Sequence, residues 1–370
     1  MKGAVRLSLF IVDGSIDVTG ALVSAARQAM LLKDDVDTVL VLSRFHRVPA
    51  ERMTAFAEVI TLPFVSPRKH VVNLIFYLPA LLLSSVQLRL AMRRRGCERL
   101  QLNDFYLLHG AMLRLLGFRG RIATFVRIDP TRYGPAGRFW LAAARWCSNE
   151  MAAVSLFIQS LLGEDYPTRL IYGQVSLATT VVAEPDADRP LFLFVGNYIE
   201  GKGQEYAVEA FNRIALHYPA ARLRFVGGDM GLDKNKAFRA HLERLAEAGP
   251  ARDRIEFHGA SNDLGSHYAT AFAAINFSES ESFSITCLDA SAVGLPVVAT
   301  RCGGPEEIIE DGRTGWLVKV GDIAAMAERM GWLLEHPGDA AAMGAAGRIR
   351  VAERFSPERA IAALKSMYDL

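Results

Sequence analysis

The chain has 370 residues, of which 51% are hydrophobic and 22% are charged. This length exceeds the size at which single hydrophobic cores usually stop growing, and the apolar content excludes a mainly disordered chain, so two packed domains are expected. The net charge of +2 is uneven, because residues 1–180 carry +9 and residues 181–370 carry −7; this favours an anionic membrane surface as a partner of the first half, and no recognition motif supports nucleic acid.

The first elements are predicted to form a strand–helix–strand unit. A strand is expected from Ala4 to Val12, a helix near Gly20 to Leu32 and a strand from Thr38 to Ser43. The loop from Asp13 to Thr19 lacks the G-x-G-x-x-G pattern of dinucleotide-binding proteins, which excludes a dehydrogenase of that type. Strand-like and helical stretches alternate along the rest of the chain, which predicts α/β domains with parallel sheets.

An apolar run from Val71 to Val86 comes next, and arginines 89, 93, 94 and 95 follow it. The run contains Asn73 and Pro79 and is shorter than the ~20 residues that a membrane-spanning helix needs. Two interpretations remain open. The run can be a buried helix with a solvated basic end, or an interface-lying helix that docks on anionic lipid, which the basic charge of the first half favours.

Two predicted strands of the first half lead into polar residues. Asn103-Asp104 follows a strand near Leu100, and Arg127 follows a strand from Arg121 to Val126. His109 is expected on the helix after Asp104. Loops at the ends of parallel strands are common positions for functional side chains, so these residues are candidates for chemistry.

A polar, proline-bearing segment from Val181 to Pro190 is predicted to link the domains. The next strand begins at Leu191 and leads into Gly196-Asn-Tyr-Ile-Glu-Gly-Lys-Gly203. This loop nearly fits the phosphate-binding pattern G-x-x-x-x-G-K-[ST], but its last residue is Gly203, so no hydroxyl is available for Mg²⁺ and triphosphatase activity is not expected. The Asp186-Ala-Asp188 pair resembles a metal-binding D-x-D motif but lies in the linker, so neither a metal nor another cofactor is expected.

The most informative stretch runs from Ala271 to Thr300. It predicts a strand from Ala271 to Phe277, a polar loop, a helix from Ser284 to Val293 and a following buried strand. A helix N-terminus at the carboxyl end of a strand is a common phosphate site in α/β proteins. The flanking carboxylates of Glu281 and Asp289 cannot bind phosphate and are expected to hold hydroxyls. A site that binds both phosphates and hydroxyls suggests a nucleotide-sugar.

This stretch resembles the Glu-x7-Glu signature of retaining, nucleotide-sugar-dependent glycosyltransferases of the GT-B fold, often called family 4. Glu281 matches the first acid, and Asp289 stands in the place of the second. The segments Leu191 to Gly203 and Gly303 to Gly315 resemble the same family, so that the resemblance spans roughly residues 190 to 330.

The resemblance implies a fold and three segments. The fold is α/β, with two Rossmann-like domains that face a cleft. Residues 1–182 would form an acceptor-side domain and residues 188–355 a nucleotide-sugar-binding domain. Residues 356–370 would form a C-terminal helix that could cross back to the first domain.

The donor site implied by the resemblance is built mainly from the second domain. Lys202 would neutralise the leaving phosphate, the alternative being a solvated loop lysine. Glu281 would reach the hydroxyls of the donor sugar, and Asp289 those of the ribose, the alternative being a solvated helix residue. Asn197 replaces the usual arginine, so Arg301 or Arg127 is expected to compensate, or the leaving group is stabilised less. The implied donor-binding residues are Gly196, Asn197, Lys202, His258, Gly259, Glu281, Ser282, Phe283, Ser284, Ile285 and Asp289.

The resemblance also implies a catalytic set of Glu281, Lys202, Arg127 and Asp104. Glu281 is interpreted as a positioning group, because in this family the leaving phosphate is proposed to take the proton of the acceptor. Relatives often carry histidine at the first-domain positions, where this chain has Asp104 and Arg127.

The sequence therefore predicts a hexosyltransferase that moves a sugar from a UDP- or GDP-sugar to a lipid-linked or cell-envelope glycan in polysaccharide biosynthesis. The alternatives are a nucleotide-sugar epimerase of the same fold and a non-catalytic nucleotide-sugar-binding homologue. The four cysteines lack metal spacing and the N-terminus lacks a signal-peptide pattern, so a cytoplasmic protein, peripheral on the inner face of the membrane, is expected.

Overall fold

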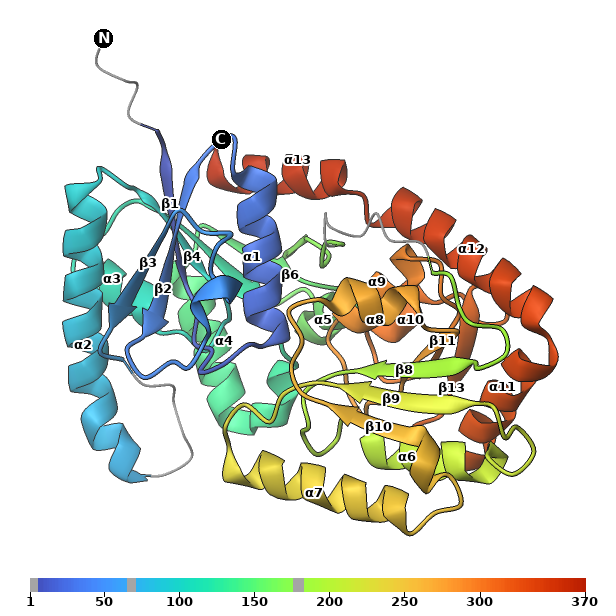
Figure 1. Ribbon diagram of the computed structural model, residues 1–370. Coiled ribbons are helices and arrows are strands. Elements are labelled where there is room, and N and C mark those ends of the chain that lie inside the picture. Colours follow the sequence, from blue (N-terminus) through green and yellow to red (C-terminus); the bar gives the residue numbers. More distant parts are fainter. Residues whose placement is uncertain (1–5, 65–70, 176–182) are drawn as a thin grey trace. The chain divides into compact units, whose positions relative to one another are not determined.

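The computed structural model describes residues 6–64, 71–175 and 183–370. The chain divides into two compact units, one made of Met1–Gln174 with Pro357–Leu370 and the other of Val175–Ser356 (Figure 1). Both units are α/β with parallel sheets, and the predicted fold class with two Rossmann-like sheets is confirmed. The predicted end of the first domain, at residue 182, falls in a segment outside the described residues.

Within its described residues, the first unit has a seven-stranded parallel sheet in the order β3-β2-β1-β4-β5-β6-β7. This order is that of Rossmann folds, in which the first strand is central and the chain then turns to the other side. The strands are apolar almost throughout, as expected where helices cover both faces. The strands are β1 (Ser8–Val12), β2 (Asp37–Ser43), β3 (Glu58–Leu62), β4 (Arg99–Leu102), β5 (Arg121–Val126), β6 (Glu150–Ala153) and β7 (Arg169–Leu170).

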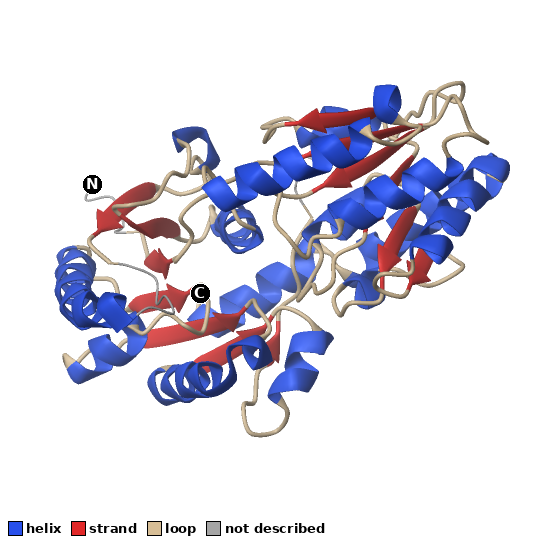
Figure 2. Cartoon of the chain, turned by 90° about the horizontal axis from the view of Figure 1, so that it is seen from below, coloured by secondary structure: helices blue, strands red, loops and turns tan. Residues whose placement is uncertain are grey.

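Helices cover both faces of this sheet (Figure 2). Because crossovers between parallel strands are right-handed, α1 lies on one face and α2, α3 and α4 on the other. Contacts between α2 and α3, between α3 and α4, and between α1 and α13 agree with this arrangement. The helices are α1 (Gly20–Leu32), α2 (Val71–Arg94), α3 (His109–Leu115), α4 (Gly134–Cys147), α5 (Leu156–Leu162) and α13 (Pro357–Tyr368), with short 3-10 turns η1 (Ala50–Arg52) and η2 (Pro130–Tyr133).

The sequence predicted several of these elements closely. The helix Gly20–Leu32 is present and begins after Thr19, whose side chain accepts a hydrogen bond from the Leu22 N–H. The first strand begins at Ser8 rather than Ala4, and residues 4 and 5 lie outside the described residues. The apolar run is one continuous helix, α2, that extends through Pro79 to Arg94. Among the described residues, none of the helices has both the length and the apolar character needed to cross a membrane.

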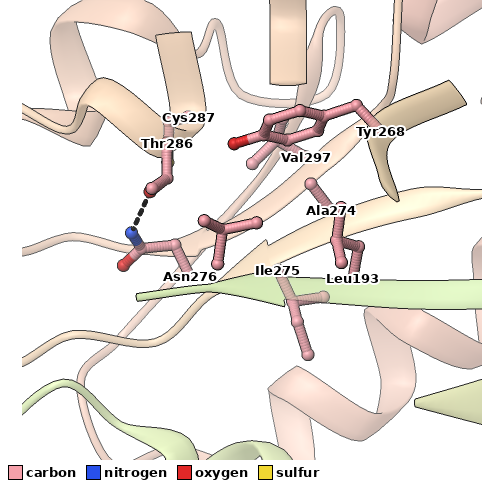
Figure 3. A pocket seen from close by; sticks show the side chains of 9 residues that line it. Leu193, Tyr268, Ala274, Ile275, Asn276, Thr286, Cys287 and Val297 are labelled. Atoms are coloured by element: carbon pink, nitrogen blue, oxygen red, sulfur yellow. Dashed lines mark hydrogen bonds between the residues drawn. The ribbon is translucent and has the colours of Figure 1, made fainter. Parts of the chain in front are cut away.

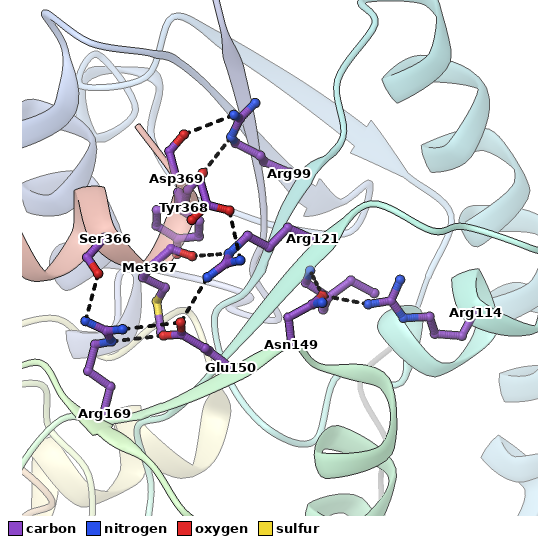
Figure 4. A network of polar contacts seen from close by, with 11 residues as sticks. Arg99, Arg114, Arg121, Asn149, Glu150, Arg169, Ser366, Met367, Tyr368 and Asp369 are labelled. Atoms are coloured by element: carbon purple, nitrogen blue, oxygen red, sulfur yellow. Dashed lines mark hydrogen bonds and ion pairs between the residues drawn. The ribbon is translucent and has the colours of Figure 1, made fainter.

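Arginines at the amino ends of the sheet strands hold the C-terminal helix α13 on the first unit (Figure 4). Arg99 donates to the Tyr368 carbonyl at 2.7 Å, and Arg121 donates to the Met367 carbonyl and pairs with Asp369 at 2.9 Å. These carbonyls belong to the last helical turn, where carbonyl oxygens have no N–H partner within the helix. The positive guanidinium groups also oppose the negative end of the helix dipole. Residues 357–370 thus belong to the first unit through specific bonds.

The second unit has a six-stranded parallel sheet in its described residues, in the order β10-β9-β8-β11-β12-β13. This is again the Rossmann order, with β8 at the start and the change of direction between β8 and β11. The strands are β8 (Leu191–Val195), β9 (Arg222–Val226), β10 (Ile255–His258), β11 (Ala273–Asn276), β12 (Val297–Thr300) and β13 (Gly315–Val318).

A large apolar core lies between this sheet and its helices. It gathers aromatic side chains such as Phe192, Phe211 and Phe225, all fully or almost fully buried. Helices α6 and α11 pack together, as do α9 and α12. The helices are α6 (Gln204–Ile214), α7 (Asp233–Glu247), α8 (Leu264–Ala269), α9 (Ile285–Ala292), α10 (Pro305–Ile308), α11 (Ile323–Glu335) and α12 (Pro337–Arg354), with one 3-10 turn, η3 (Arg252–Arg254).

Candidate functional site

Lys202 and Glu281 meet at the carboxyl edge of the second sheet. Lys202 follows β8 and Glu281 follows β11, the neighbouring strands between which the chain changes direction. Ligands of open α/β sheets bind at this point. The Lys202 Nζ lies 2.7 Å from the Glu281 Oε1, which also accepts a hydrogen bond from the Ser278 hydroxyl at 2.8 Å. The side chains are 34% and 15% exposed, so the pair is partly open to a ligand.

The loop that carries Lys202 is fixed against the loop after β11. Gly203 has a φ of +79°, and a Cβ there would lie 2.0 Å from the Phe277 carbonyl oxygen, so only glycine fits. The Ser278 hydroxyl oxygen also lies 3.3 Å from the Lys202 carbonyl oxygen, and the Glu279 N–H donates to the Gly201 carbonyl at 2.9 Å. Both loops therefore hold Lys202 beside Glu281.

Helix α9 begins directly after this pair. Ser284 caps the helix, because its hydroxyl accepts from the Cys287 N–H. The Asn276 side chain, at the end of β11, donates to the Ser284 hydroxyl at 3.1 Å. It also donates to the Thr286 hydroxyl at 3.1 Å (Figure 3). The predicted helix, Ser284 to Val293, is one residue longer at each end than the observed Ile285–Ala292. Asn276 is a site residue that the sequence reasoning missed.

A small, mostly apolar cavity lies beneath the start of α9. Figure 3 shows Asn276 and Thr286 at one end and Tyr268 among apolar side chains at the other. The lining residues are Leu193, Val195, Tyr268, Ala274, Ile275, Asn276, Thr286, Cys287 and Val297. These apolar walls suit the packing of α9 on the sheet rather than recognition of a charged ligand.

The Gly303-Gly304 loop after β12 closes on Glu281. The Glu281 N–H donates to the Cys302 carbonyl at 3.1 Å, and the Gly304 N–H donates to the Glu281 carbonyl at 2.7 Å. A Cβ on Gly304 would lie 2.5 Å from the Phe283 Cα, so a side chain there would displace the segment between Glu281 and α9. This contact requires glycine at position 304, and Gly303 before it has a positive φ of 116°, which favours glycine.

Asp289 lies in the middle of α9 and is only 3% exposed. The alternative of a solvated helix residue is therefore wrong. A carboxylate this buried needs polar partners, because burial of an ionised group costs several kcal/mol. Its expected contact with ribose stays a prediction.

Asn197 and Gly196 connect the loop after β8 to the loop after β9. The Asn197 Oδ1 accepts from the Gly228 N–H at 3.1 Å, and a Cβ on Gly227 would lie 1.9 Å from the Gly196 carbonyl oxygen. Arg301, considered as a substitute for the missing arginine, forms an ion pair with Asp311. The guanidinium of Arg301 is thus already engaged by a carboxylate.

His258 and Gly259 lie at the end of β10, the edge strand beyond β9. His258 is 43% exposed, with its Nε2 3.2 Å from the Glu256 Oε2, and no atom lies within 4 Å of a Cβ placed on Gly259. These two residues are accessible. They are two strands away from the Lys202–Glu281 pair, a separation of about 10 Å at the usual strand spacing.

A second polar cluster lies at the corresponding point of the first sheet, where β1 adjoins β4. Asp13, after β1, accepts hydrogen bonds from the Asn103 side chain and the Ser15 N–H. Asp104 accepts from the Phe105 and Arg127 N–H groups at 2.9 and 3.2 Å. Asp13 was also missed by the sequence reasoning, because a lone carboxylate after a first strand carries no motif.

Arg127 is buried within this cluster rather than on the surface. Its Nε donates to the Asn103 Oδ1 at 2.8 Å and its Nη2 to the Gln28 Oε1 at 3.1 Å. Burial lowers the pKa of Arg127 to about 10 and raises the pKa of Asp104 to about 7, although the Arg127 N–H and charge act against the second shift. Arg127 is therefore not a surface residue. A carboxyl group that titrates near neutrality is typical of functional sites.

His109 opens α3, as expected, but it is fully enclosed. Its Nε2 lies 3.1 Å from the Ser84 hydroxyl of α2, and burial lowers its pKa to about 4. It is thus a neutral core histidine. In the part of the chain that the structure describes, no three His, Cys, Asp or Glu side chains are grouped so that they could hold a metal.

Residues 180–350 match the family model described as "Glycosyl transferases group 1". The GDP-mannose-dependent alpha-(1-6)-phosphatidylinositol monomannoside mannosyltransferase of Mycolicibacterium smegmatis is 35% identical over 170 residues, 44% of this chain and 43% of the relative. The D-inositol 3-phosphate glycosyltransferase of Xylanimonas cellulosilytica is 35% identical over 184 residues, 49% of this chain and 42% of the relative. The chain thus matches less than half the length of these curated relatives.

Solved structures share the whole fold at low identity. Anabaena HepE in complex with UDP-glucose superposes with a TM-score of 0.82, at 16% identity, over 99% of this chain and 100% of that chain. Sucrose-phosphate synthase from Thermosynechococcus elongatus gives a TM-score of 0.80, at 18% identity, over 98% of each chain. The fold is that of GT-B glycosyltransferases.

Proposed function

We propose that this chain is a glycosyltransferase, on the premise that residues 180–350 match the group 1 glycosyltransferases and carry the donor site. The observation that carries the proposal is the Lys202–Glu281 pair, which lies where parallel sheets bind ligands and directly before the N-terminus of α9. The donor is a UDP- or GDP-sugar. A structural neighbour solved in complex with UDP-glucose supports a UDP-sugar. A GDP-mannose-dependent relative supports a GDP-sugar.

The leaving diphosphate would be held by α9 and Lys202. The first N–H groups of a helix have no partners within the helix, so those of Ile285 and Thr286 can donate to phosphate oxygens. The helix field adds about 0.3–1 kcal/mol, and up to about 2 kcal/mol in partly buried geometries. Lys202 adds a full positive charge where the leaving group becomes more negative. Its ammonium can turn toward the phosphate because it is held by only one carboxylate and is partly exposed.

The carboxylates of Glu281 and Asp289 would hold hydroxyl groups of the donor sugar and of the ribose. Glu281 is placed for this role by Ser278 and by the backbone bonds of the Gly303-Gly304 loop. The backbone of Ser282 to Ile285 would line the diphosphate, and the Gly196-Asn197 loop would lie beside it. His258 and Gly259 would lie near the base, which the accessible end of β10 allows.

Retaining transfer is part of the proposal. The bond from the anomeric carbon to the diphosphate breaks, the acceptor hydroxyl attacks from the same face, and its proton passes to a leaving phosphate oxygen. Asp104 and Arg127 of the first unit would act on the acceptor side. A carboxyl group with a pKa of about 7 can accept or donate a hydrogen bond to a hydroxyl at neutral pH. No metal is required in this scheme, because Lys202 and α9 balance the charge.

The acceptor proposed is a lipid-linked or cell-envelope glycan, and the chain would work as a peripheral protein on the inner face of a membrane. The positive first half and the arginines that end α2 support this placement. A relative named as a phosphatidylinositol monomannoside mannosyltransferase supports a lipid acceptor.

A two-step experiment tests the proposal. Thermal unfolding is measured with UDP, GDP, ADP and CMP; the cognate diphosphate should raise the midpoint, because ligands that bind only the folded state stabilise it. Release of the diphosphate from UDP- and GDP-sugars is then measured over time. Binding without any donor turnover, with glycan or lipid acceptors supplied, would favour the non-catalytic alternative. No stabilisation by any diphosphate would contradict the donor site itself.

A further inference from the structure

Helix α2 exposes large apolar side chains along the side that faces away from the sheet. Leu83, Val86 and Leu90 recur at spacings of three and four residues, which places them on one stripe of the helix. They lie opposite the buried Leu81 and Leu88. Leu83 is 51% exposed, and the outer side of a surface helix is normally polar. The expectation of a buried helix is therefore wrong for this side of α2.

Helix α4 repeats this pattern. Phe139 and Trp146 lie two turns apart on the side opposite the buried Leu141 and Ala144, and each is 61% exposed. Two large exposed aromatic side chains on one short helix are unusual for a face in contact with water. The sequence does not single out this helix, because its four alanines and two glycines weaken the apolar signal.

The two stripes belong to one layer of the first unit. Helices α2 and α4 cover the same face of the seven-stranded sheet, with α3 packed against both. Leu115 of α3, 72% exposed, lies between them along the chain. The three helices contain six arginines and no acidic residue. In the described residues, Arg93, Arg94, Arg138 and Arg145 form no ion pair with a carboxylate.

We propose that this surface docks on an anionic lipid bilayer. The docking face consists of Leu83, Val86, Leu90, Phe139 and Trp146, with Arg93, Arg94, Arg138 and Arg145 among them. Aromatic and branched apolar side chains enter the interface between headgroups and acyl chains, where tryptophan is favoured. Arginines reach the phosphates while their stems stay against the apolar surface. The absence of acidic residues from the three helices matches a negative partner in charge.

This inference extends the membrane association in the proposed function from α2 to a second helix, and it does not depend on glycosyl transfer. Several basic residues near an anionic surface together give reversible binding that salt weakens, and this face carries four arginines. The apolar side chains determine how deeply the face enters the bilayer. The contribution of the arginines and that of the apolar side chains can thus be tested with separate variants.

The test is sedimentation of the full chain with vesicles of phosphatidylglycerol and phosphatidylcholine, compared with vesicles of phosphatidylcholine alone. The double variant Phe139→Ser, Trp146→Ser should bind the anionic vesicles at least about tenfold more weakly. The matched control, Leu216→Ser with Ile349→Ser, removes two apolar side chains from the second unit that are at least as exposed, and should bind like the wild type. Arg138→Ser with Arg145→Ser should weaken binding and reduce its salt dependence.

Tryptophan fluorescence adds a second readout. Lipids brominated in the acyl chains should quench the wild-type protein, and Trp146→Phe should remove most of that quenching. Unchanged binding of the α4 double variant, or equal binding to neutral vesicles, would overturn the proposal. A stable dimer that the same variant dissociates would show that a second copy covers the face, and would also overturn it. Diphosphate affinity, measured on the same samples, should stay unchanged, so a failure here is distinct from failure of the donor site.

Discussion

Lys202 and Glu281 form an ion pair, with 2.7 Å between Nζ and Oε1, across the two strands at which the second sheet changes direction. Without a ligand, each charge neutralises the other. A nucleotide-sugar would divide the pair, because its diphosphate attracts the ammonium and its sugar hydroxyls donate to the carboxylate. The contact therefore holds the two side chains beside each other at the edge of the sheet.

Replacement of Glu281 by glutamine separates nucleotide binding from transfer. The variant Glu281→Gln frees Lys202 and removes a negative charge near the diphosphate, so UDP or GDP affinity should stay equal or rise. Transfer should fall about 10- to 100-fold, because a charged hydrogen bond contributes about 1.5–3 kcal/mol. Calorimetry and initial rates measure the two effects. The control Glu279→Gln alters a neighbouring carboxylate that accepts a hydrogen bond from Tyr206, and should leave both nucleotide affinity and transfer rate almost unchanged. A large loss of nucleotide affinity in Glu281→Gln would contradict the role of Glu281 in binding the sugar hydroxyls.

Gly203 is required by close contact, not by flexibility. The variant Gly203→Ala places a Cβ 2.0 Å from the Phe277 carbonyl at a positive φ, so the loop that carries Lys202 must move. We expect the free energy of unfolding to fall by roughly 1–3 kcal/mol and nucleotide binding to weaken. Denaturant unfolding checks the first effect and calorimetry the second. The control Gly338→Ala has open space around its Cβ and should be almost neutral; equal effects in both variants would refute the argument.

The raised pKa of Asp104 predicts a pH dependence of stability. With a pKa of about 7 in the folded chain and an ordinary value near 3.8 otherwise, the folded state binds more protons between these pH values. The free energy of unfolding therefore decreases as the pH rises from about 4 to about 7. Asp104→Asn keeps the acceptor oxygen and removes the titration, so the variant should lose less stability over this range. The measured quantity is the difference between wild type and variant at each pH.

This difference isolates Asp104 because His109 acts in the opposite direction. Burial lowers the pKa of His109 to about 4, so its contribution to the free energy of unfolding rises between about pH 4 and 6.5. It is common to both proteins and cancels in the comparison. Parallel curves for wild type and Asp104→Asn would show that Asp104 titrates normally.

Transfer should not require a divalent metal. Lys202 and the N-terminus of α9 are proposed to balance the charge of the leaving diphosphate, so activity should persist after treatment with EDTA and desalting. The rate is compared with and without added Mg²⁺ and Mn²⁺. Loss of activity on chelation that either metal restores would contradict the scheme.

The sequence predicted the second unit better than the first. Motifs with fixed glycine spacing placed Lys202 and Glu281 on adjacent loops, because Gly203 and Gly304 are each required by one close backbone contact. Alternating apolar strands and capped helices predicted the parallel sheets. Asp13 and Asn276 were missed because their importance depends on which strands become neighbours, and a parallel sheet joins segments far apart in the sequence.

Long-range burial explains the remaining differences. Arg127 and Asp289 looked compatible with solvent exposure, but tertiary packing buries both. In α2, periodicity could not distinguish an apolar side that faces the core from one that faces outward, since the helix is apolar on both. The roles of Asp104 and Arg127 toward an acceptor stay predictions, because no local pattern defines them.

The central claim is that Lys202 and the start of α9 hold a nucleotide diphosphate. The most direct measurement is calorimetric titration of UDP and GDP into the wild type, Lys202→Ala and the exposed-lysine control Lys319→Ala. Loss of one charged phosphate contact should weaken binding about 10- to 100-fold in Lys202→Ala, with circular dichroism and the unfolding midpoint almost unchanged. Lys319→Ala should match the wild type. Equal affinity of folded Lys202→Ala and wild type for both diphosphates would contradict the account.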